Sequence, residues 1–305
     1  MGLTLPLVAT AAAVAAPFLA ERLRPIPEAA LGPAPGRFAD LPLGRTHYIW
    51  AGPKGGKVAV LVHGLTTPSF AWEAVVPLLV EKGYRVLTYD HIGRGWSRAT
   101  PARQDAAFFT DHLSGLLAHQ GVSGRITLLG YSMGGMVVTA FAAAFPERVE
   151  RAVLVTPGGL GHDLGWLEEF VGRAPLLGDW LMLALGGWRL RQGLRATLGA
   201  PAAVERIAER QIAASRVRGF LPSILNSQRN MLSDQGAIHR LLAASGVPLT
   251  AIWGDADTVI PLAAKDRLAA LNPGARQVVV AGADHGLPYT HPQDVAAALE
   301  VAPGA

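Results

Sequence analysis

The chain has 305 residues, of which 50% are hydrophobic and 16% are charged, a balance that excludes a disordered chain and indicates a globular or membrane-associated protein. It contains no cysteine, which excludes disulfides, thiolate metal sites and a cysteine nucleophile. The formal net charge is only +4 and basic residues are scattered among acidic ones, so no nucleic-acid partner is expected.

The first 24 residues form an apolar N-terminal segment. No charged residue occurs from Leu3 to Ala20, and Glu21 to Arg24 follow directly. The segment is close to the minimum of about 17 residues for a membrane span, but its alanine content and two prolines argue against one. Three interpretations stay open: a membrane anchor, a helix docked on protein, and a secretory leader, for which a basic start is missing. Arginines after the segment favour a cytoplasmic body at the inner face of the membrane, with a secreted or periplasmic location as the alternative.

Residues 25–44 are rich in proline and glycine and are expected to be a linker. After them, short β-rich runs alternate with helical patterns. Strands are expected at 47–50, 58–62, 85–89, 125–130, 151–155, 249–253 and 277–281. Helices are expected at 70–83, 105–121, 133–146, 262–274 and 292–302. The central strands are apolar throughout, as in strands buried on both faces of a parallel sheet, so residues 45–160 and 247–305 predict a doubly wound, mostly parallel α/β sheet.

The interval 161–246 interrupts this alternation. It has no strand pattern, only helical patterns in which Trp166, Trp180 and Trp188 lie among leucines. Because the sheet pattern resumes unchanged afterwards, we expect a helical cap over one end of the sheet. The alternative is a few more helices of the core.

The motif Gly130-Tyr131-Ser132-Met133-Gly134 lies between an expected strand and an expected helix. In that context the glycines permit a tight turn that lifts a strained serine above the sheet, which makes Ser132 the candidate nucleophile. Its place at the amino end of a helix favours developing negative charge.

A second strand-to-helix turn carries His63-Gly64. Gly64 would let the backbone approach the serine, so that the N–H groups of Leu65 and Met133 could form an oxyanion hole. His63 lies beside this turn and is expected to be a structural histidine rather than a base.

Five motifs carry a resemblance to a known family: HG at 63–64, YDHIGRGWS at 89–97, GYSMGG at 130–135, WGDADTVIP at 253–261 and GADHG at 282–286. In this order they resemble the α/β-hydrolase superfamily, and most closely its capped serine esterases and monoacylglycerol-lipase-like members. The resemblance covers roughly residues 45 to 300 outside the cap. It implies the α/β-hydrolase fold and a catalytic order of serine, acid, histidine. The turn with Asp90, Gly93 and Gly95 is expected to be structural.

The resemblance also implies which residues complete the site. Members place the acid after either of two strands and the histidine after the last strand, which makes His285 the base. The first acid position holds Thr156 to Gly159, with no carboxylate before Asp163, and looks empty. At the second position the family pattern selects Asp257, which leaves Asp255 a local backbone role. Where members often carry a further acidic residue after the histidine, this chain has His291.

These expectations describe a serine hydrolase that cleaves carboxylic esters through an acyl-enzyme, using Ser132, His285 and Asp257, without a cofactor or a metal. A carboxylesterase acting on small-molecule esters with hydrophobic acyl groups is the first choice, and an acylglycerol or phospholipid lipase is the alternative. Lactone, amide or carbon–carbon hydrolysis stays open. A non-catalytic binding protein that kept the fold is the rival from another class.

Overall fold

The computed structural model describes residues 4–161 and 165–299, with the backbone alone at 4–7 and 166–168. Its centre is an eight-stranded sheet with the order β1-β2-β4-β3-β5-β6-β7-β8. The strands are β1 (Arg37–Leu41), β2 (Gly44–Ala51), β3 (Lys57–Val62), β4 (Tyr84–Tyr89), β5 (Ile126–Tyr131), β6 (Val149–Val155), β7 (Leu249–Gly254) and β8 (Arg276–Val280). Strands β3 to β8 run parallel, whereas β1 and β2 form an antiparallel edge. The predicted doubly wound α/β sheet is confirmed.

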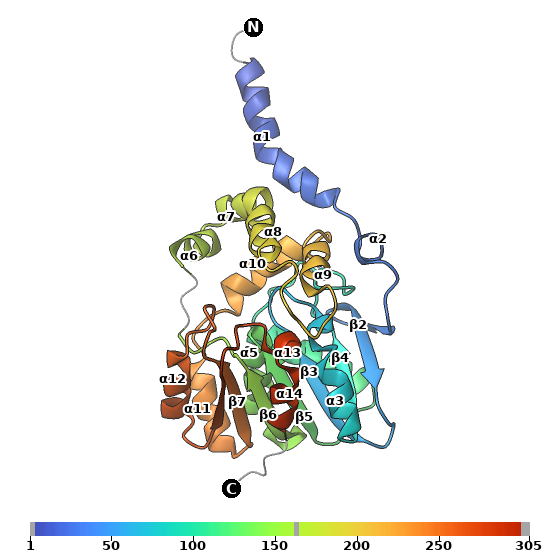
Figure 1. Ribbon diagram of the computed structural model, residues 1–305. Coiled ribbons are helices and arrows are strands. Elements are labelled where there is room, and N and C mark those ends of the chain that lie inside the picture. Colours follow the sequence, from blue (N-terminus) through green and yellow to red (C-terminus); the bar gives the residue numbers. More distant parts are fainter. Residues whose placement is uncertain (1–3, 162–164, 300–305) are drawn as a thin grey trace.

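Helices cover both faces of the sheet (Figure 1). One face carries η1 (Ser69–Trp72), α3 (Val75–Glu81), α13 (Leu287–Thr290) and α14 (Pro292–Ala297), and its core is built around Trp72, Leu79 and Val295. The other carries α4 (Ala106–His119), α5 (Met133–Ala144), α11 (Gly236–Ser245) and α12 (Ala263–Leu271), with Phe109, Met136 and Leu268 in its core. A short turn of helix, η2 (Pro146–Arg148), precedes β6. Because both faces are covered, the central strands are buried and apolar on both sides.

A group of helices lies over the carboxyl ends of the strands (Figure 1). They are α6 (Trp166–Arg173), α7 (Leu177–Leu181), the π-helix η3 (Met182–Gly186), α8 (Gly187–Arg195), α9 (Ile207–Ala214) and α10 (Phe220–Asn230), and we call them the cap. The predicted boundaries of 161–246 were too wide, because α11 packs against α5 and α12 and so belongs to a layer of the sheet.

The expectation of a linker over residues 25–44 is wrong in part. This stretch contains α2 (Pro27–Leu31) and the whole of β1, which pairs with β2 in a hairpin whose register joins Leu41 to Gly44. The strand was missed because it is a short edge strand with only its central residue, Ala39, buried. Flanking prolines and glycines therefore dominate the local pattern.

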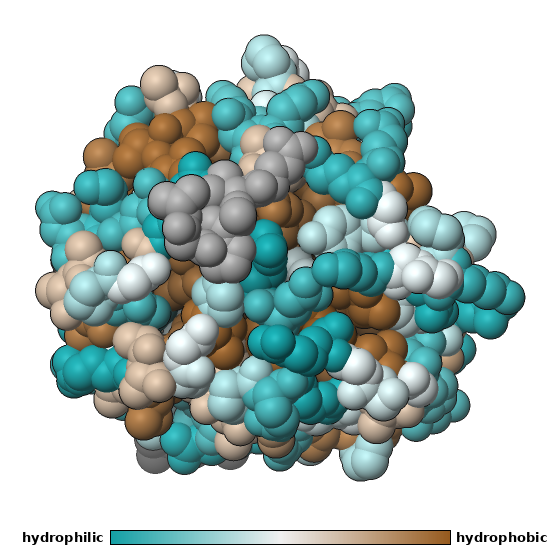
Figure 2. All heavy atoms as spheres, turned by 90° about the horizontal axis from the view of Figure 1, so that it is seen from below, coloured by the Kyte–Doolittle hydropathy of each residue, from teal (hydrophilic) through white to brown (hydrophobic). Residues whose placement is uncertain are grey.

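Helix α1 (Thr4–Arg22) precedes α2 and extends beyond the cap (Figure 1). It touches α7 and η3, and the indole N–H of Trp180 donates to the Ala13 carbonyl oxygen (3.3 Å). Within the described residues, no helix combines the length and hydropathy needed to cross a membrane. The opposite end of the molecule, where the parallel strands begin, is seen in Figure 2 with hydrophilic side chains over much of it and apolar patches between them.

Buried histidines make the stability of this fold sensitive to acid. Burial lowers the pKa of His63 to about 4, of His112 to about 3 and of His239 to about 4. An unfolded histidine titrates near 6.5, so as the pH falls the unfolded chain takes up these protons before the folded chain does. The contribution of these neutral, buried histidines to the free energy of unfolding is thus complete above about pH 6.5. It is lost as the pH falls toward the pKa values that the histidines have in the folded chain. For His47, burial lowers the pKa but the hydrogen bond and charge of Asp90 raise it more, so this one group acts in the opposite sense.

We expect the free energy of unfolding, measured by urea titration, to fall by on the order of a few kcal/mol between about pH 7 and about pH 4.5. His239→Leu should reduce this loss, because neither ring nitrogen of His239 has a hydrogen-bond partner among the described residues. If the free energy of unfolding fell equally with pH in the variant and the wild type, His239 would not contribute to the acid sensitivity.

Candidate active site

Ser132 lies in the turn between β5 and α5, at the carboxyl edge of the sheet. Its backbone has φ 54° and ψ −118°, a strained conformation that residues other than glycine rarely adopt. The Ser132 N–H donates to the Val155 carbonyl oxygen (2.9 Å), and the Ser132 carbonyl oxygen accepts from the Gly135 N–H (2.9 Å). The turn is therefore held from both sides, and the half-buried serine is presented above the sheet.

The two glycines around Ser132 are needed because backbone segments approach each other closely. A Cβ on Gly130 would lie 2.3 Å from the Gly134 carbonyl oxygen, and a Cβ on Gly134 would lie 2.1 Å from the Val62 carbonyl oxygen. Neither distance is compatible with a side chain. The G-x-S-x-G spacing is thus required by the packing of α5 against β3 and β5.

A continuous chain of hydrogen bonds joins the three residues that the sequence singled out. His285 Nε2 lies 3.0 Å from Ser132 Oγ, and His285 Nδ1 lies 2.8 Å from Asp257 Oδ2. The serine follows β5, the aspartate follows β7 and the histidine follows β8, so the parallel strands deliver all three to one edge. With the Nδ1 proton donated to the carboxylate, Nε2 can accept the serine proton, which is the arrangement of an activated nucleophile.

Asp257 and Asp255 occupy different environments. The Asp257 side chain is 1% exposed, and its Oδ1 accepts the N–H groups of Val259 (2.7 Å) and Ile260 (2.9 Å), which leaves Oδ2 for His285. Asp255 is exposed, and its Oδ1 accepts the Gly282 N–H (2.6 Å), which ties the loop after β7 to the loop after β8. The geometry therefore brings Asp257, and not Asp255, to the histidine.

The alternative acid position after β6 holds no carboxylate in the described residues. Thr156 is buried there and has φ 42°. Asp163, the next carboxylate along the chain, lies outside the described residues.

Two tyrosines that the sequence did not point to support His285. The Tyr131 ring lies 5.3 Å from the imidazole, centroid to centroid, and meets the Tyr289 ring edge-on at 6.4 Å. The Tyr289 carbonyl oxygen also accepts the N–H of Ala203 (2.7 Å), which connects the histidine loop to the segment before α9 of the cap. His291, at the position of the missing acidic residue, instead has its Nδ1 2.9 Å from Thr290 Oγ1.

The turn after β3 brings backbone N–H groups close to Ser132. A Cβ on Gly64 would lie 3.2 Å from the Ser132 Cβ, so a larger residue here would push the turn away from the serine. The N–H of Leu65 has no hydrogen-bond partner among the described residues. Met133 is the first residue of α5, so its N–H has no carbonyl partner one turn earlier in the helix. Both predicted donors thus lie beside the nucleophile, where an oxyanion would form.

His63 is a structural residue of this turn, as expected. It is fully buried, its Nδ1 donates to the Gly64 carbonyl oxygen (2.7 Å), and its Nε2 accepts the His91 N–H (2.9 Å). Since burial lowers its pKa to about 4, it is neutral near pH 7 and can hold both bonds. It has no contact with Ser132 that would make it a base.

A buried pair, His47 and Asp90, was missed by the sequence. Their side chains are fully buried, with Nδ1 2.8 Å from Oδ2, and Asp90 also accepts the N–H groups of Ser69 (2.9 Å) and Trp96 (3.0 Å). Burial raises the pKa of Asp90, but the hydrogen bond and charge of His47 offset this, and the net pKa is below its usual value. The pair holds the turn with Asp90, Gly93 and Gly95, which was predicted to be structural. His47 and Asp90 meet only because β2 pairs with β4.

Arg94 was also missed, although it belongs to one of the motifs. It is fully buried, and burial lowers its pKa to about 9, which still leaves it charged near pH 7. Its Nε donates to the Leu65 carbonyl oxygen (3.2 Å), and its two terminal nitrogens donate to Gln104 Oε1 (2.6 Å) and Ser227 Oγ (2.7 Å). The guanidinium therefore connects the turn after β3 to α10 of the cap.

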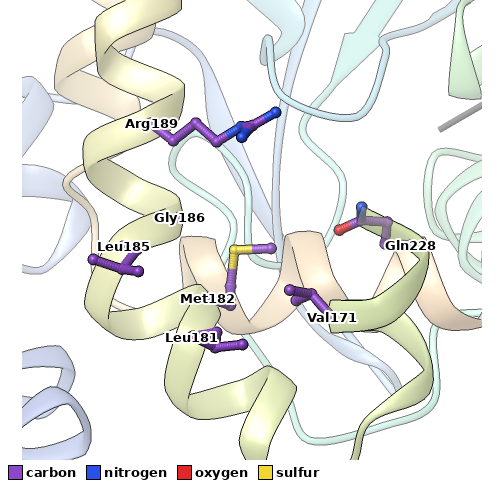
Figure 3. A pocket seen from close by; sticks show the side chains of 7 residues that line it. All are labelled: Val171, Leu181, Met182, Leu185, Gly186, Arg189 and Gln228. Atoms are coloured by element: carbon purple, nitrogen blue, oxygen red, sulfur yellow. The ribbon is translucent and has the colours of Figure 1, made fainter. Parts of the chain in front are cut away.

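Two adjoining cavities lie in the cap beside this turn. The larger, about 420 Å³, is bounded by Leu65 and Thr66 at one end and by η3, α8 and α10. The smaller, about 110 Å³, shares Met182, Gly186, Arg189 and Gln228 with the first and continues to Val171 and Leu181. Figure 3 shows Met182 and Val171 pointing toward one another across the smaller cavity, with Arg189 and Gln228 on one side. In the described part of the chain, no cluster of three histidine or acidic side chains could hold a metal ion.

Comparison with known proteins places this geometry in a family. The model of the alpha/beta hydrolase family matches residues 59–298. A 2-hydroxy-6-oxononadienedioate/2-hydroxy-6-oxononatrienedioate hydrolase from Burkholderia vietnamiensis is 29% identical, over 81% of this chain and 86% of that protein.

Solved structures agree with this match. A hydrolase from Pseudomonas aeruginosa has a TM-score of 0.68 and 25% identity, covering 86% of this chain and 96% of that one. A thermophilic esterase from Thermogutta terrifontis has a TM-score of 0.72 and 24% identity, covering 87% of this chain and 97% of that one. With a family match over residues 59–298 and this fold, the chain belongs to the alpha/beta hydrolase family.

Proposed function

We propose that the protein is a carboxylic ester hydrolase that works through a covalent acyl-enzyme on Ser132. The observation that carries this proposal is the hydrogen-bonded series Ser132–His285–Asp257, with 3.0 Å and 2.8 Å between the reacting atoms, beside two backbone N–H donors. A serine at this position forms an ester intermediate that water can hydrolyse. The test is the replacement of Ser132 by alanine, with ester turnover and fluorophosphonate labelling as the two measurements.

In the proposed reaction, Ser132 Oγ attacks the ester carbonyl carbon while His285 Nε2 takes the hydroxyl proton. Asp257 holds the tautomer and stabilises the imidazolium that forms. The N–H groups of Leu65 and Met133 donate to the oxyanion, and each such donor is typically worth about 3 to 4 kcal/mol. His285 returns the proton to the leaving alcohol. Water then attacks the acyl-enzyme, with His285 again as the base, and releases the acid and free Ser132.

The cap cavities support an ester with a hydrophobic acyl group. The walls between Leu65 and Val171 are largely apolar, and they begin beside the residues that would hold the oxyanion. An acyl chain could therefore extend from the serine along η3.

Met182→Trp is expected to shift the preference toward short acyl chains. The indole would fill space shared by both cavities, so kcat/KM for p-nitrophenyl esters of eight or more carbons should fall about tenfold while acetate changes little. The measurement is a chain-length profile from acetate to palmitate. Leu198→Trp, at an exposed cap position outside both cavities, is the matched control and should keep the wild-type profile. An equal loss at every chain length for Met182→Trp would contradict an acyl site here.

An acylglycerol or phospholipid lipase is the second candidate. The exposed apolar residues of α1 next to the cap favour it, because a lipase must meet its substrate at a lipid surface. Dispersed acylglycerols and phospholipids, measured beside soluble esters, separate the two. Higher turnover on dispersed lipid than on soluble esters would identify the protein as a lipase.

A further inference from the structure

The exposed part of α1 is apolar without being covered. Among residues 8–20 every side chain except those at 15 and 17 is exposed, and the segment carries no charge. Val14 is 57% exposed, Leu19 is 54% exposed, and Leu23 just beyond the helix is 83% exposed. A helix that is apolar around its whole circumference belongs in a nonpolar surrounding. Such a helix on the outside of a protein marks an interaction surface.

The neighbouring cap continues this apolar surface. Helix α1 touches α7 and η3, and these elements with the adjoining loop and α8 expose four large apolar side chains, at the end of the molecule away from the sheet (Figure 1). They are Leu176 (79% exposed), Leu177 (52%), Leu185 (56%) and Trp188 (59%). We call residues 8–23, which comprise most of α1 and Leu23 after it, together with these four residues, the docking face.

Arginines gather at the foot of α1, just beyond its last residue and beside Gly187 at the start of α8. A Cβ on Gly187 would lie 2.9 Å from a guanidinium nitrogen of Arg191 and 3.4 Å from one of Arg24, so these two side chains converge. Burial lowers the pKa of Arg191, and the charges of Arg24, Arg216 and Arg195 lower it further, which places all four within electrostatic reach of one another.

Most of this positive charge is not neutralised by carboxylates. Arg24 pairs with Glu21 (2.6 Å), but Arg191, Arg195 and Arg216 form no ion pair in the described part of the chain. One terminal nitrogen of Arg191 is buried without any hydrogen-bond partner there. Guanidinium groups held together against their mutual repulsion favour binding of anions.

We infer that the docking face binds an anionic lipid bilayer, with α1 in the apolar layer and the arginines at its foot against the lipid phosphates. A membrane surface has an apolar layer of acyl chains beneath a layer of anionic phosphates. An apolar helix with basic residues at its end matches both layers in order and in chemistry. A second copy of this chain would cover the apolar residues but would offer the arginines more arginines and no phosphate, whereas an anionic lipid covers the apolar residues and supplies the opposite charge, so charge complementarity favours the lipid.

This placement gives the cap cavity a position at the membrane. The elements that α1 touches, α7 and η3, also provide Leu181, Met182 and Leu185 to the lining of the smaller cavity. Docking through α1 would therefore hold that cavity next to the bilayer. The inference concerns binding and does not depend on the proposed hydrolysis, so Ser132→Ala should bind vesicles as the wild type does.

The test is co-flotation of the full chain with vesicles of phosphatidylcholine alone or mixed with phosphatidylglycerol. The wild type should float with both and bind the anionic vesicles more tightly, with the difference lost at high salt. Arg191→Gln with Arg195→Gln should lower partitioning to the anionic vesicles about thirtyfold, because each basic residue near such a surface contributes about fivefold. Val14→Glu with Leu19→Glu should abolish binding to both. All four positions are exposed or half-exposed, so the fold, checked by circular dichroism, should persist.

The matched control removes two positive charges from the end where the sheet strands begin. Lys54 and Arg276 are exposed in the turn before β3 and at the start of β8, and Lys54→Gln with Arg276→Gln should leave flotation unchanged. Three outcomes would overturn the inference: wild type that floats with neither vesicle, arginine variants that float as well as the wild type, or equal losses in the control. Wild type that sediments as a dimer, becomes monomeric in Val14→Glu with Leu19→Glu, and does not float would assign the face to a second copy.

Discussion

Ser132→Ala is expected to lower the turnover of p-nitrophenyl esters by about 10⁶-fold, to the level left by binding and the oxyanion donors. The reason is that no other hydroxyl among the described residues is held against His285, whose Nε2 lies 3.0 Å from Ser132 Oγ. The same variant should not be labelled by a fluorophosphonate, because the reagent needs the activated oxygen. Initial rates and gel-based labelling measure both effects.

Ser123→Ala is the matched control for this experiment. Ser123 is an exposed serine in the loop before β5, and its replacement should leave both rate and labelling as in the wild type. Ester turnover that persists in correctly folded Ser132→Ala would exclude this serine as the nucleophile. Wild type that is folded but inert to both ester and fluorophosphonate would favour the non-catalytic binding protein.

Asp257→Asn is expected to lower turnover by about 10⁴-fold, as the wrong imidazole tautomer does in serine proteases. An amide at this position would donate to His285 Nδ1 instead of accepting from it, so Nε2 would carry the proton and could not take one from Ser132. KM should change much less than kcat, because the acyl chain does not touch this residue in the proposed reaction. Steady-state kinetics on one ester measures both constants.

The chain offers its own control two residues earlier. Within the described residues the Asp255 side chain accepts a single loop N–H, from Gly282, so Asp255→Asn should cost less than about tenfold. If Asp255→Asn lowered turnover more than Asp257→Asn, the partner of His285 would be Asp255 and not Asp257, although the role of Ser132 would stand. Equal and small losses of turnover in both variants would show that neither carboxylate takes part in the reaction.

The sheet could be predicted from the sequence because its central strands are continuous apolar runs. Buried strands such as β3 and β5 leave a pattern that no solvent-facing residue interrupts. The edge strand β1 has one buried residue, Ala39, and its local sequence resembles a loop. The limits of the cap were misjudged for a related reason, since the apolar side of α11 looks the same whether it faces α5 or another cap helix.

The residues at the reaction centre could be predicted because each follows directly on a strand. Ser132, Asp257 and His285 come after β5, β7 and β8, so strand order alone brings them to one edge. Arg94 carries no such signal, because its partners Leu65 and Ser227 lie far along the chain and are assembled only by folding. Long-range contacts of this kind leave no local pattern in a single sequence.

The most direct test of the central claim is to detect the acyl group on the enzyme. The wild type would be mixed with a p-nitrophenyl ester, quenched in acid within the first turnover, digested and examined by mass spectrometry. We predict a mass increase equal to the acyl group on the peptide that carries Ser132, and none in Ser132→Ala. Ester hydrolysis without any adduct, or an adduct on another residue, would contradict the proposed mechanism.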